Sequence, residues 1–347
     1  MYNILVDFFG RYKVKILLDE NKPFYKANLH IHSHLSDGQH SPERLKEEYK
    51  KRGYSIVAFT DHEHLIDNSH LDDEEFLTIT SCELAVKEFP NQSTLKNFSM
   101  KAAHFNAYAL DQHNTLTPCH SRVYERPFIN DNCRELLRES GEYAREYSAE
   151  GINKMIAEVK RQGFLVSYNH PSWSLEDARN YMAYEGMDFV EIYNHSCVQM
   201  GHNDDEDVFD DLLRADKNVF CTACDDAHNR HPFDAPESDC FGGWVSVTAE
   251  KLEYGEVMTA LANGDFYAST GPSILSLVLD GDKVRVKTSG ARCISYITKG
   301  RKRKTVFAEK GGVLTEAEFT VSDTDEYFRL RVTDGEGKHA YTQAYNL

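Results

Sequence analysis

Seven short apolar runs alternate with helical patterns along most of this chain, and each run ends in a polar residue of metal-ligand type. The runs cover residues 26–32, 55–60, 76–81, 101–110, 163–168, 188–193 and 219–223. Strands that alternate with helices predict an α/β fold with a mostly parallel sheet. The carboxyl ends of such strands meet at one rim, as in a barrel. Because there are seven runs, we expect a distorted (β/α)7 barrel.

Two other segments depart from this alternation. Residues 111–150 are polar and follow the fourth run, so we predict an inserted, cap-like segment there. Beyond Pro272 the pattern changes to period two, with a turn signal at Asp280-Gly281. We therefore expect a barrel domain over residues 1–271 and a small C-terminal antiparallel, sandwich-like β domain over 272–347. Within the first of these, residues 1–20 are typical of a hairpin.

Charge and cysteine content restrict partners and location. The net charge of −17 argues against general nucleic-acid binding, although cations in a cleft would still attract a small anionic substrate. The eight scattered cysteines fit reduced thiols, and no secretory signal or membrane span is visible, so we expect a cytoplasmic protein without a membrane partner. Cys221 and Cys224 lie inside an apolar run, which favours a buried strand over a redox or zinc motif.

The strongest chemical signal is the order of polar residues at the strand ends. Residues two apart on a strand share a face, so His30 and His32 can offer two imidazoles to one cation. Similar residues follow other runs. His104 is less distinctive, because its apolar neighbours also fit a core histidine. The candidate metal ligands are His30, His32, Asp37, His62, Glu83, His104, His170, Asp226 and His228.

In order, these motifs resemble the polymerase-and-histidinol-phosphatase (PHP) family of metal-dependent phosphoesterases, which are amidohydrolase-like, TIM-like barrels. The resemblance implies two to three divalent ions, of zinc, manganese or iron, and a trinuclear centre at the upper limit. It implies one ion at His30, His32, Glu83 and Asp226. A second would lie at Asp37, His62 and His228, and a third at Glu83, His104 and His170.

The implied reaction is hydrolysis of a small phosphorylated metabolite or nucleotide by a metal-bridging hydroxide. Asp226 would take the proton of the water, and His195 would protonate the leaving group. The alternatives are a carboxylic or carbamic ester hydrolase with the same centre, a nuclease acting on nucleic-acid ends, and a non-catalytic binding module. Residues 170–173 and 264–272 resemble a PHP subgroup with an appended β domain, of the carbaryl-hydrolase type.

Substrate contacts are predicted from residues near these motifs. Arg230, two residues beyond His228, is the first candidate for the substrate anion, although such arginines also fit a role in offsetting surface carboxylates. Three further candidates are the strand-end residue Asn194 and two residues of the cap-like segment, Arg122 and Arg126. We expect Asp61 and Asp225 to orient ligating imidazoles, and His34 and His64 to be exposed loop residues.

Overall fold

The computed structural model describes residues 14–89, 99–138, 141–301 and 303–347. The chain divides into two compact units. Among the described residues, the larger unit comprises those within 26–244 and 252–255, and the β unit comprises 14–25 together with those within 245–251 and 256–347. The units therefore divide near Trp244 rather than at the predicted 271, and the segment before Lys26 groups with the C-terminal unit.

The larger unit contains a sheet of seven strands, one for each predicted run. Their order in the sheet is that of the sequence. Every neighbouring pair is parallel except the two pairs made by the fourth strand, β5, which runs opposite to β4 and β6. The strands are β2 (Phe24–Ile31), β3 (Tyr54–Phe59), β4 (Leu77–Lys87), β5 (Ala102–Ala109), β6 (Phe164–Asn169), β7 (Phe189–Asn194) and β8 (Phe220–Cys224).

The two ends of this sheet approach each other at one point. A parallel bridge joins Ile31, at the end of β2, to Ala227, just after β8. Two backbone hydrogen bonds flank it, from His32 N to Ala227 O and from Asp226 N to His30 O. The observed fold is thus a mixed α/β sheet with bridged ends, and the closed barrel stays a prediction.

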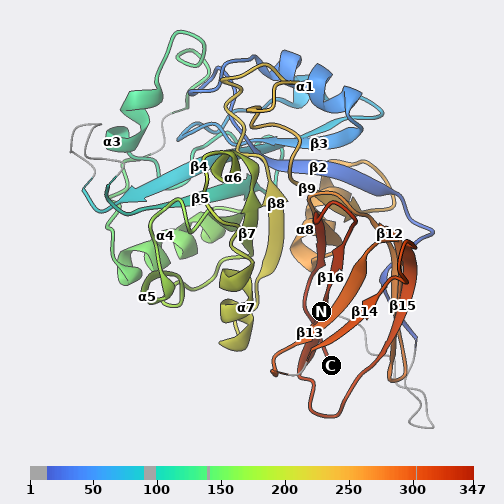
Figure 1. Ribbon diagram of the computed structural model, residues 1–347. Helices are drawn as coiled ribbons and strands as arrows, with labels where there is room; N and C mark the ends of the chain where they lie inside the picture. The colour runs from blue at the N-terminus through green and yellow to red at the C-terminus, as the bar shows by residue number, and fades with distance from the viewer. Residues whose placement is uncertain (1–13, 90–98, 139–140, 302) are drawn as a thin grey trace. The chain divides into compact units, whose positions relative to one another are not determined.

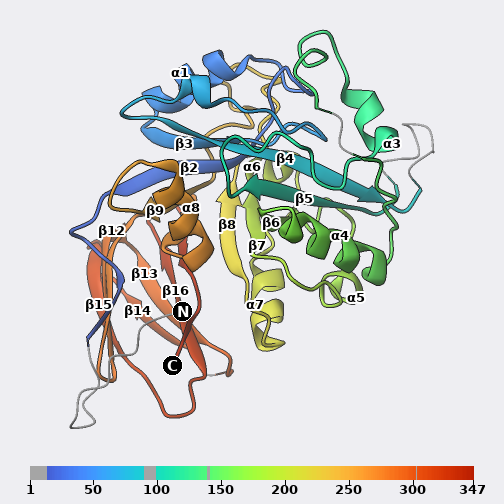
Figure 2. The ribbon, with the colours of Figure 1, turned by 180° about the vertical axis from the view of Figure 1, so that it is seen from behind.

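Helices cover this sheet where the sequence signals predict them (Figures 1 and 2). Helix α1 (Pro42–Lys51) packs on β3, α4 (Ala149–Arg161) on β6 and α7 (Glu206–Arg214) on β7. The Ser41 side chain caps α1, and a proline occupies the first turn of this helix. The shorter helices are η1 (Ser69–Leu71), α3 (Arg122–Glu125), η2 (Arg126–Phe128), α5 (Ala178–Tyr181) and α6 (His195–Gln199), and α8 (Tyr254–Asn263) follows later in the chain.

In its described residues, the predicted cap-like segment, 111–150, contains α3, η2 and the beginning of α4. It is attached to loops of the sheet. Asn130 Nδ2 donates to the carbonyl oxygens of His34 and Ser36, each at 3.1 Å. Arg145 forms a buried two-pronged pair with Glu63, at 2.8 and 2.6 Å. The segment is therefore fixed to the loops that follow β2 and β3.

The β unit contains two sheets, built largely from antiparallel pairs of strands, with one shared core. One sheet has the order β1-β11-β12-β15, and the other contains β14-β13-β16-β17-β10-β9, with β18 paired to β16. Val284 and Leu277 from the first pack in one cluster with Ile294, Phe328 and Leu330 from the second. The predicted hairpin at Asp280-Gly281 is confirmed as β11 and β12. The strands are β1 (Lys15–Leu18), β9 (Trp244–Thr248), β10 (Phe266–Ser269), β11 (Ile274–Asp280), β12 (Lys283–Ala291), β13 (Cys293–Thr298), β14 (Lys304–Phe307), β15 (Leu314–Thr320), β16 (Tyr327–Thr333), β17 (His339–Thr342) and β18 (Tyr345–Asn346).

Three smaller predictions can be compared with the structure. The N-terminal hairpin lies largely outside the described residues, and the part that is described, β1, pairs with β11. Cys221 and Cys224 lie buried in β8, which confirms the strand, and all eight cysteines are buried and free. Among the described residues, no helix has the length and apolar character needed to cross a membrane.

Candidate metal centre

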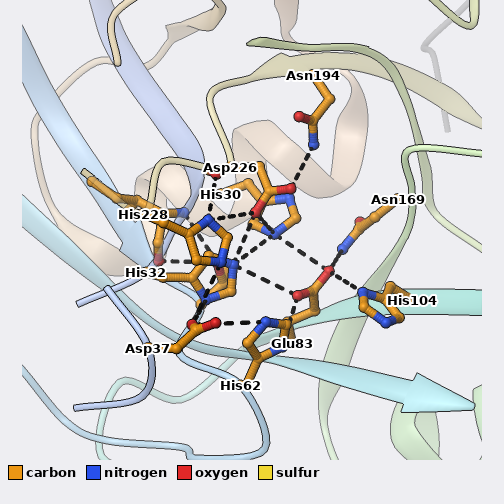
Figure 3. A network of polar contacts seen from close by, with 12 residues as sticks. His30, His32, Asp37, His62, Glu83, His104, Asn169, Asn194, Asp226 and His228 are labelled. Atoms are coloured by element: carbon orange, nitrogen blue, oxygen red, sulfur yellow. Dashed lines mark hydrogen bonds and ion pairs between the residues drawn. The ribbon is translucent and has the colours of Figure 1, made fainter. Parts of the chain in front are cut away.

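All nine candidate ligands lie along one edge of the sheet (Figure 3 shows eight of them labelled). Eight of them come from carboxyl-terminal parts of strands or from the segments that follow. His104 differs, because it is the third residue of β5 and lies opposite Asn169, the last residue of β6. Since β5 is antiparallel, its beginning lies at the edge where its neighbours end. The prediction of ligand-type residues at the end of every run is wrong for β5, yet His104 reaches the same place.

Glu83 lies in the middle of the constellation (Figure 3). Its Oε1 is 3.2 Å from both His104 Nδ1 and His170 Nε2, and its Oε2 is 3.0 Å from His62 Nδ1. The residue is 1% exposed. Burial alone would raise the pKa of this carboxyl, but His104, His30 and His62 outweigh it and hold the pKa well below its ordinary value. Glu83 is therefore an ionised carboxylate shared by several imidazoles.

Asp226 joins a second set of imidazoles. Its Oδ1 is 2.9 Å from His32 Nε2 and 3.2 Å from His30 Nε2, while its Oδ2 is 3.8 Å from His170 Nε2. Both Asp226 (φ 54°) and His170 (φ 31°) have left-handed backbone conformations, which non-glycine residues rarely adopt. Strained backbone of this kind is concentrated at functional sites in proteins.

Asp37 lies at the other side of His32. Its Oδ1 is 3.4 Å from His228 Nε2 and 3.9 Å from both His62 Nε2 and His32 Nδ1. The His32 ring stacks between those of His62 and His228, with centroid distances of 4.4 and 4.3 Å. Burial lowers the pKa of His228, but Asp37 and Asp226 outweigh it and raise the pKa to about 9.

The donor atoms fit a divalent cation. They form three groups in which all ligand-type atoms lie within 4.8 Å of one another. Burial lowers the pKa of His32 and brings that of His104 to about 4, which keeps both imidazoles neutral. His32 Nδ1 and His104 Nε2 are buried without a hydrogen-bond partner among the described residues. Neutral imidazole and carboxylate donors suit zinc, manganese or iron. The groups are His32 with Asp37, His62 and His228; His30 with His32 and Asp226; and His30 with Glu83 and His170.

These groups differ in part from the three ligand sets implied by the resemblance. His32 belongs to the group of Asp37 as well as to that of Asp226. His104 lies outside all three groups, although it contacts Glu83. The two to three ions and their ligand sets therefore stay a proposal, and the structure itself provides clusters able to hold metal.

Two buried carboxylates beside the centre have a different role from the one predicted. Asp61 accepts hydrogen bonds from Ser33 N, Ser33 Oγ and Ser36 Oγ. Asp225 accepts from Tyr49 Oη and from the backbone N–H groups of residues 241–243. The expectation that they orient imidazoles is wrong, because they hold the loop after β2 and the segment at 241–243.

The orienting carboxylate is Glu191, in the middle of β7, which our sequence analysis missed. Its Oε1 is 3.0 Å from His30 Nδ1, and its Oε2 accepts from His170 N and Asn194 Nδ2. The signal was present in the sequence, since a glutamate between Val190 and Ile192 in an apolar run requires a polar partner when the strand is buried.

The two predicted residues that follow β7 differ in their contacts. Asn194 donates to Asp226 Oδ2 at 3.1 Å and accepts from Cys197 N as the cap of α6, so its described contacts position protein groups. His195 Nδ1 is 3.0 Å from Tyr193 Oη, and its Nε2 is 3.3 Å from Gln199 Nε2. Substrate contact by Asn194 and proton donation by His195 stay predictions.

The three predicted arginines are exposed. Arg230 lies two residues beyond His228, and Arg126 begins η2, which ends at Phe128. The Phe128 ring stacks on His62 with a centroid distance of 4.4 Å. Arg122 begins α3, where its backbone N–H donates to Glu142. Their part in anion binding stays a prediction.

The two histidines expected in exposed loops differ in burial. His64 is fully buried, with its Nε2 3.7 Å from Cys133 Sγ, so the expectation of an exposed side chain is wrong for it. His34 is half-buried, and its carbonyl oxygen accepts from Asn130. The loop after β2 is thus covered more fully than its polar sequence predicts.

The comparison with protein families identifies part of the chain. Residues 28–163 match the sequence profile of the PHP domain. This stretch is thus similar to a PHP domain, and it covers less than half of the 347 residues. This match extends from β2 to the beginning of β6 and includes six of the nine candidate ligands. The other three, His170, Asp226 and His228, lie beyond the matched residues of the PHP domain. No curated protein matches the chain.

Solved structures also resemble the chain. A two-domain Bacteroides vulgatus protein containing a predicted PHP-like metal-dependent phosphoesterase is 14% identical, with coverage of 97% of this chain and 98% of its own and a TM-score of 0.44. A candidate metal-dependent phosphoesterase of Bifidobacterium adolescentis is 17% identical, with coverage of 62% and 93% and a TM-score of 0.39. A Chromobacterium violaceum amidohydrolase with bound sulfate and no metal is 13% identical, with coverage of 58% and 87% and a TM-score of 0.34. None of these three is described as a carbaryl hydrolase, and that resemblance stays a prediction.

Proposed function

We propose that the larger unit is a metal-dependent phosphoesterase that hydrolyses a small phosphorylated metabolite or nucleotide. The observation that carries this proposal is the position of Glu83, whose carboxylate contacts three histidines from three different parts of the chain within 3.2 Å. The match to the PHP domain supports the same reaction class. The eight ligand-type side chains of the three candidate groups provide no thiolate, which suits zinc, manganese or iron.

Divalent ions, when bound, would lower the pKa of coordinated water towards about 7 and neutralise charge on phosphoryl oxygens. The residues of the chain would provide the rest. Glu83, Asp37 and Asp226 supply the negative charge that holds cations. Asp226 is proposed to accept the proton of the attacking water, and His195 to donate one to the leaving group.

Substrate recognition is the remaining part of this proposal. Arg230, Arg122 and Arg126 are exposed and are proposed to bind the anionic groups of the substrate. Asn194, which donates to Asp226, is proposed to contact the substrate from the end of β7. An Arg230→Ala protein should show a raised KM for a phosphorylated substrate, while its metal content stays unchanged.

The test is an assay of metal-free protein reconstituted separately with Mn²⁺, Zn²⁺ and Fe²⁺. Phosphate monoesters, nucleotides, phosphodiesters, carboxylic esters and carbamic esters are supplied in parallel. We expect release of inorganic phosphate from a monoester or nucleotide, and loss of that release in Glu83→Gln. Hydrolysis of carboxylic or carbamic esters alone would instead support the alternative function, an ester hydrolase with the same metal centre. Cleavage of oligonucleotide ends with a steep salt dependence would favour a nuclease. Failure of every substrate with bound metal would favour a binding module.

A further inference from the structure

The buried carboxylate of Glu191 has three nitrogen atoms within hydrogen-bond distance. Its Oε1 lies 3.0 Å from His30 Nδ1. Its Oε2 lies 3.1 Å from His170 N and 2.9 Å from Asn194 Nδ2. The residue is 1% exposed, so water does not replace these partners. Three donors thus converge on one carboxylate that belongs to none of the three candidate metal groups.

The first contact determines which nitrogen of His30 carries the proton. An ionised carboxylate only accepts hydrogen bonds, so His30 Nδ1 must be the protonated nitrogen. The other ring nitrogen, Nε2, lies 3.2 Å from Asp226 Oδ1 and 3.4 Å from Glu83 Oε1. With Nδ1 held protonated by Glu191, Nε2 is the nitrogen that His30 would offer to a cation bound by the two candidate groups that contain it.

The other two contacts extend the influence of Glu191 to two more candidate ligands. The backbone N–H of His170 donates to Glu191 Oε2. His170 has φ 31°, a strained conformation that surrounding contacts such as this one stabilise. Asn194 uses the same amide nitrogen to contact Glu191 and Asp226 Oδ2, at 2.9 and 3.1 Å. Glu191 is thus linked to His30, His170 and Asp226 at once.

We propose that Glu191 is the positioning residue of the metal centre, fixing the tautomer of His30 and the orientation of His170 and Asp226 for a divalent cation. This inference rests on the proposed function only in requiring a metal centre. It does not depend on which ester is hydrolysed. Carboxylates that orient ligating histidines in other proteins change metal affinity about 10–100-fold when they are removed.

The substitution Glu191→Gln is a sharp test because it changes shape very little. The glutamine amide has one acceptor oxygen where the carboxylate has two. If the new NH₂ faces His30, the proton of that ring moves to Nε2 and the ligand lone pair is lost. If the NH₂ faces the other side, it meets the donors of His170 and Asn194. Neither orientation preserves all three contacts.

Glu176→Gln provides a matched control. Glu176 is also a buried glutamate, 8% exposed, and it accepts from the hydroxyls of Tyr147, Tyr168 and Tyr184. Each tyrosine hydroxyl can reverse its role and accept from a glutamine NH₂. This variant makes the same chemical change without contacting a candidate ligand.

The experiment has two readouts, neither of which is hydrolysis. In metal-free full-length protein labelled with ¹⁵N-histidine, the ring nitrogen shifts should show His30 protonated at Nδ1, assigned by its loss in His30→Gln. In Mn²⁺ and Zn²⁺ titrations, Glu191→Gln should bind about 10–100-fold more weakly than wild type. Glu176→Gln should bind as wild type does. Circular dichroism of the metal-free variants establishes that each is folded.

Three results would overturn the inference. These are wild-type metal affinity in folded Glu191→Gln, an equal loss in Glu176→Gln, and a His30 ring without a proton on Nδ1 in metal-free wild type. Should Glu191→Gln not fold, Glu191→Asp replaces it and should bind more weakly than wild type while keeping the Nδ1-protonated signal. A wild type that binds metal but hydrolyses no ester would contradict the proposed function and leave this inference standing.

Discussion

The edge of the sheet that carries Glu83 and the core of the β unit are both buried, but their chemistry is opposite. In the candidate centre, Glu83 is 1% exposed and His30 is 0% exposed. In the β unit, the apolar residues Phe328 and Leu330 are both 0% exposed. Burying apolar surface stabilises a fold by about 25 cal/mol per Å². Burying a charged group costs free energy unless a partner compensates. The stability of the candidate centre should therefore depend on a bound cation. The stability of the apolar core of the β unit should not depend on one.

Backbone conformation shows the same contrast. Glu63, His170 and Asp226 adopt positive φ values of 62°, 31° and 54° beside the centre. In the β unit, the residues with positive φ among those described are glycines, such as Gly281 at 61°. Glycine adopts this conformation without steric cost, whereas other residues do so where the surrounding structure enforces it. Three of the eight non-glycine residues with positive φ among those described thus lie at or beside the centre, where a bound cation would contribute to holding their conformation.

The largest effect is expected from Glu83→Gln, which weakens the most highly connected carboxylate of the centre. The substitution removes a negative charge that faces several imidazoles, so metal content should fall and turnover should drop by about 10²–10³-fold. Metal analysis and phosphate release on the same preparations measure both. The control is Glu176→Gln, and equal turnover in the two variants would place Glu83 outside the centre.

Leu330→Ala should destabilise the apolar core of the β unit and leave the candidate metal centre unchanged. Leu330 is fully buried among the apolar residues of the β unit, so truncation should reduce the free energy of unfolding by about 2–5 kcal/mol. Denaturant unfolding measures this loss. Metal content per folded chain should stay at the wild-type value, and a proportional loss of metal would mean that the two regions are not independent.

Asp205 allows a test by pH. Burial raises its pKa to about 6, above the ordinary value near 3.9, so the folded state retains this proton more tightly than the unfolded state. Its contribution to stability is present at low pH and lost as pH rises from about 4 to 6. In metal-free protein, wild type should lose up to about 3 kcal/mol relative to Asp205→Asn over this window. A constant difference in unfolding free energy would show that Asp205 has an ordinary pKa.

Removing the metal should destabilise only the larger unit. A cation present at 100 times its Kd stabilises the state that binds it by about 2.7 kcal/mol. Chelation should therefore lower the unfolding midpoint that reports on the larger unit, and Leu330→Ala should show the same decrease. If chelation leaves every midpoint unchanged in metal-loaded protein, the buried charges do not need a cation.

The smallest effect is expected from Asn130→Ala. This residue donates to the carbonyl oxygens of His34 and Ser36, directly before Asp37. Each lost hydrogen bond costs about 1 kcal/mol, so metal affinity at the group that contains Asp37 should weaken by about tenfold or less. Asn132→Ala is the control, since Asn132 makes a single contact with the same loop at 3.2 Å. A larger loss in the control would exclude a specific role for Asn130.

Much of the fold could be predicted because each local signal agreed with the final structure. All seven strand runs became strands, and the turn signal at Asp280-Gly281 became the hairpin of β11 and β12. The direction of β5 could not be predicted, since an apolar run has the same pattern in either direction. The candidate ligands were predictable from their order. For Glu191 the sequence shows that a buried glutamate needs a polar partner, but it does not show which one, because the partners lie 161 and 21 positions away in the chain.

Anomalous diffraction from metal-loaded crystals tests the central claim most directly, because it locates ions among the side chains. Data collected at the manganese or zinc edge should show ions beside Glu83 and within the group of His32, Asp37, His62 and His228. His30 Nε2, rather than Nδ1, should face the nearest ion. The absence of anomalous density at this edge of the sheet, with manganese, zinc and iron each supplied in excess, would contradict the account.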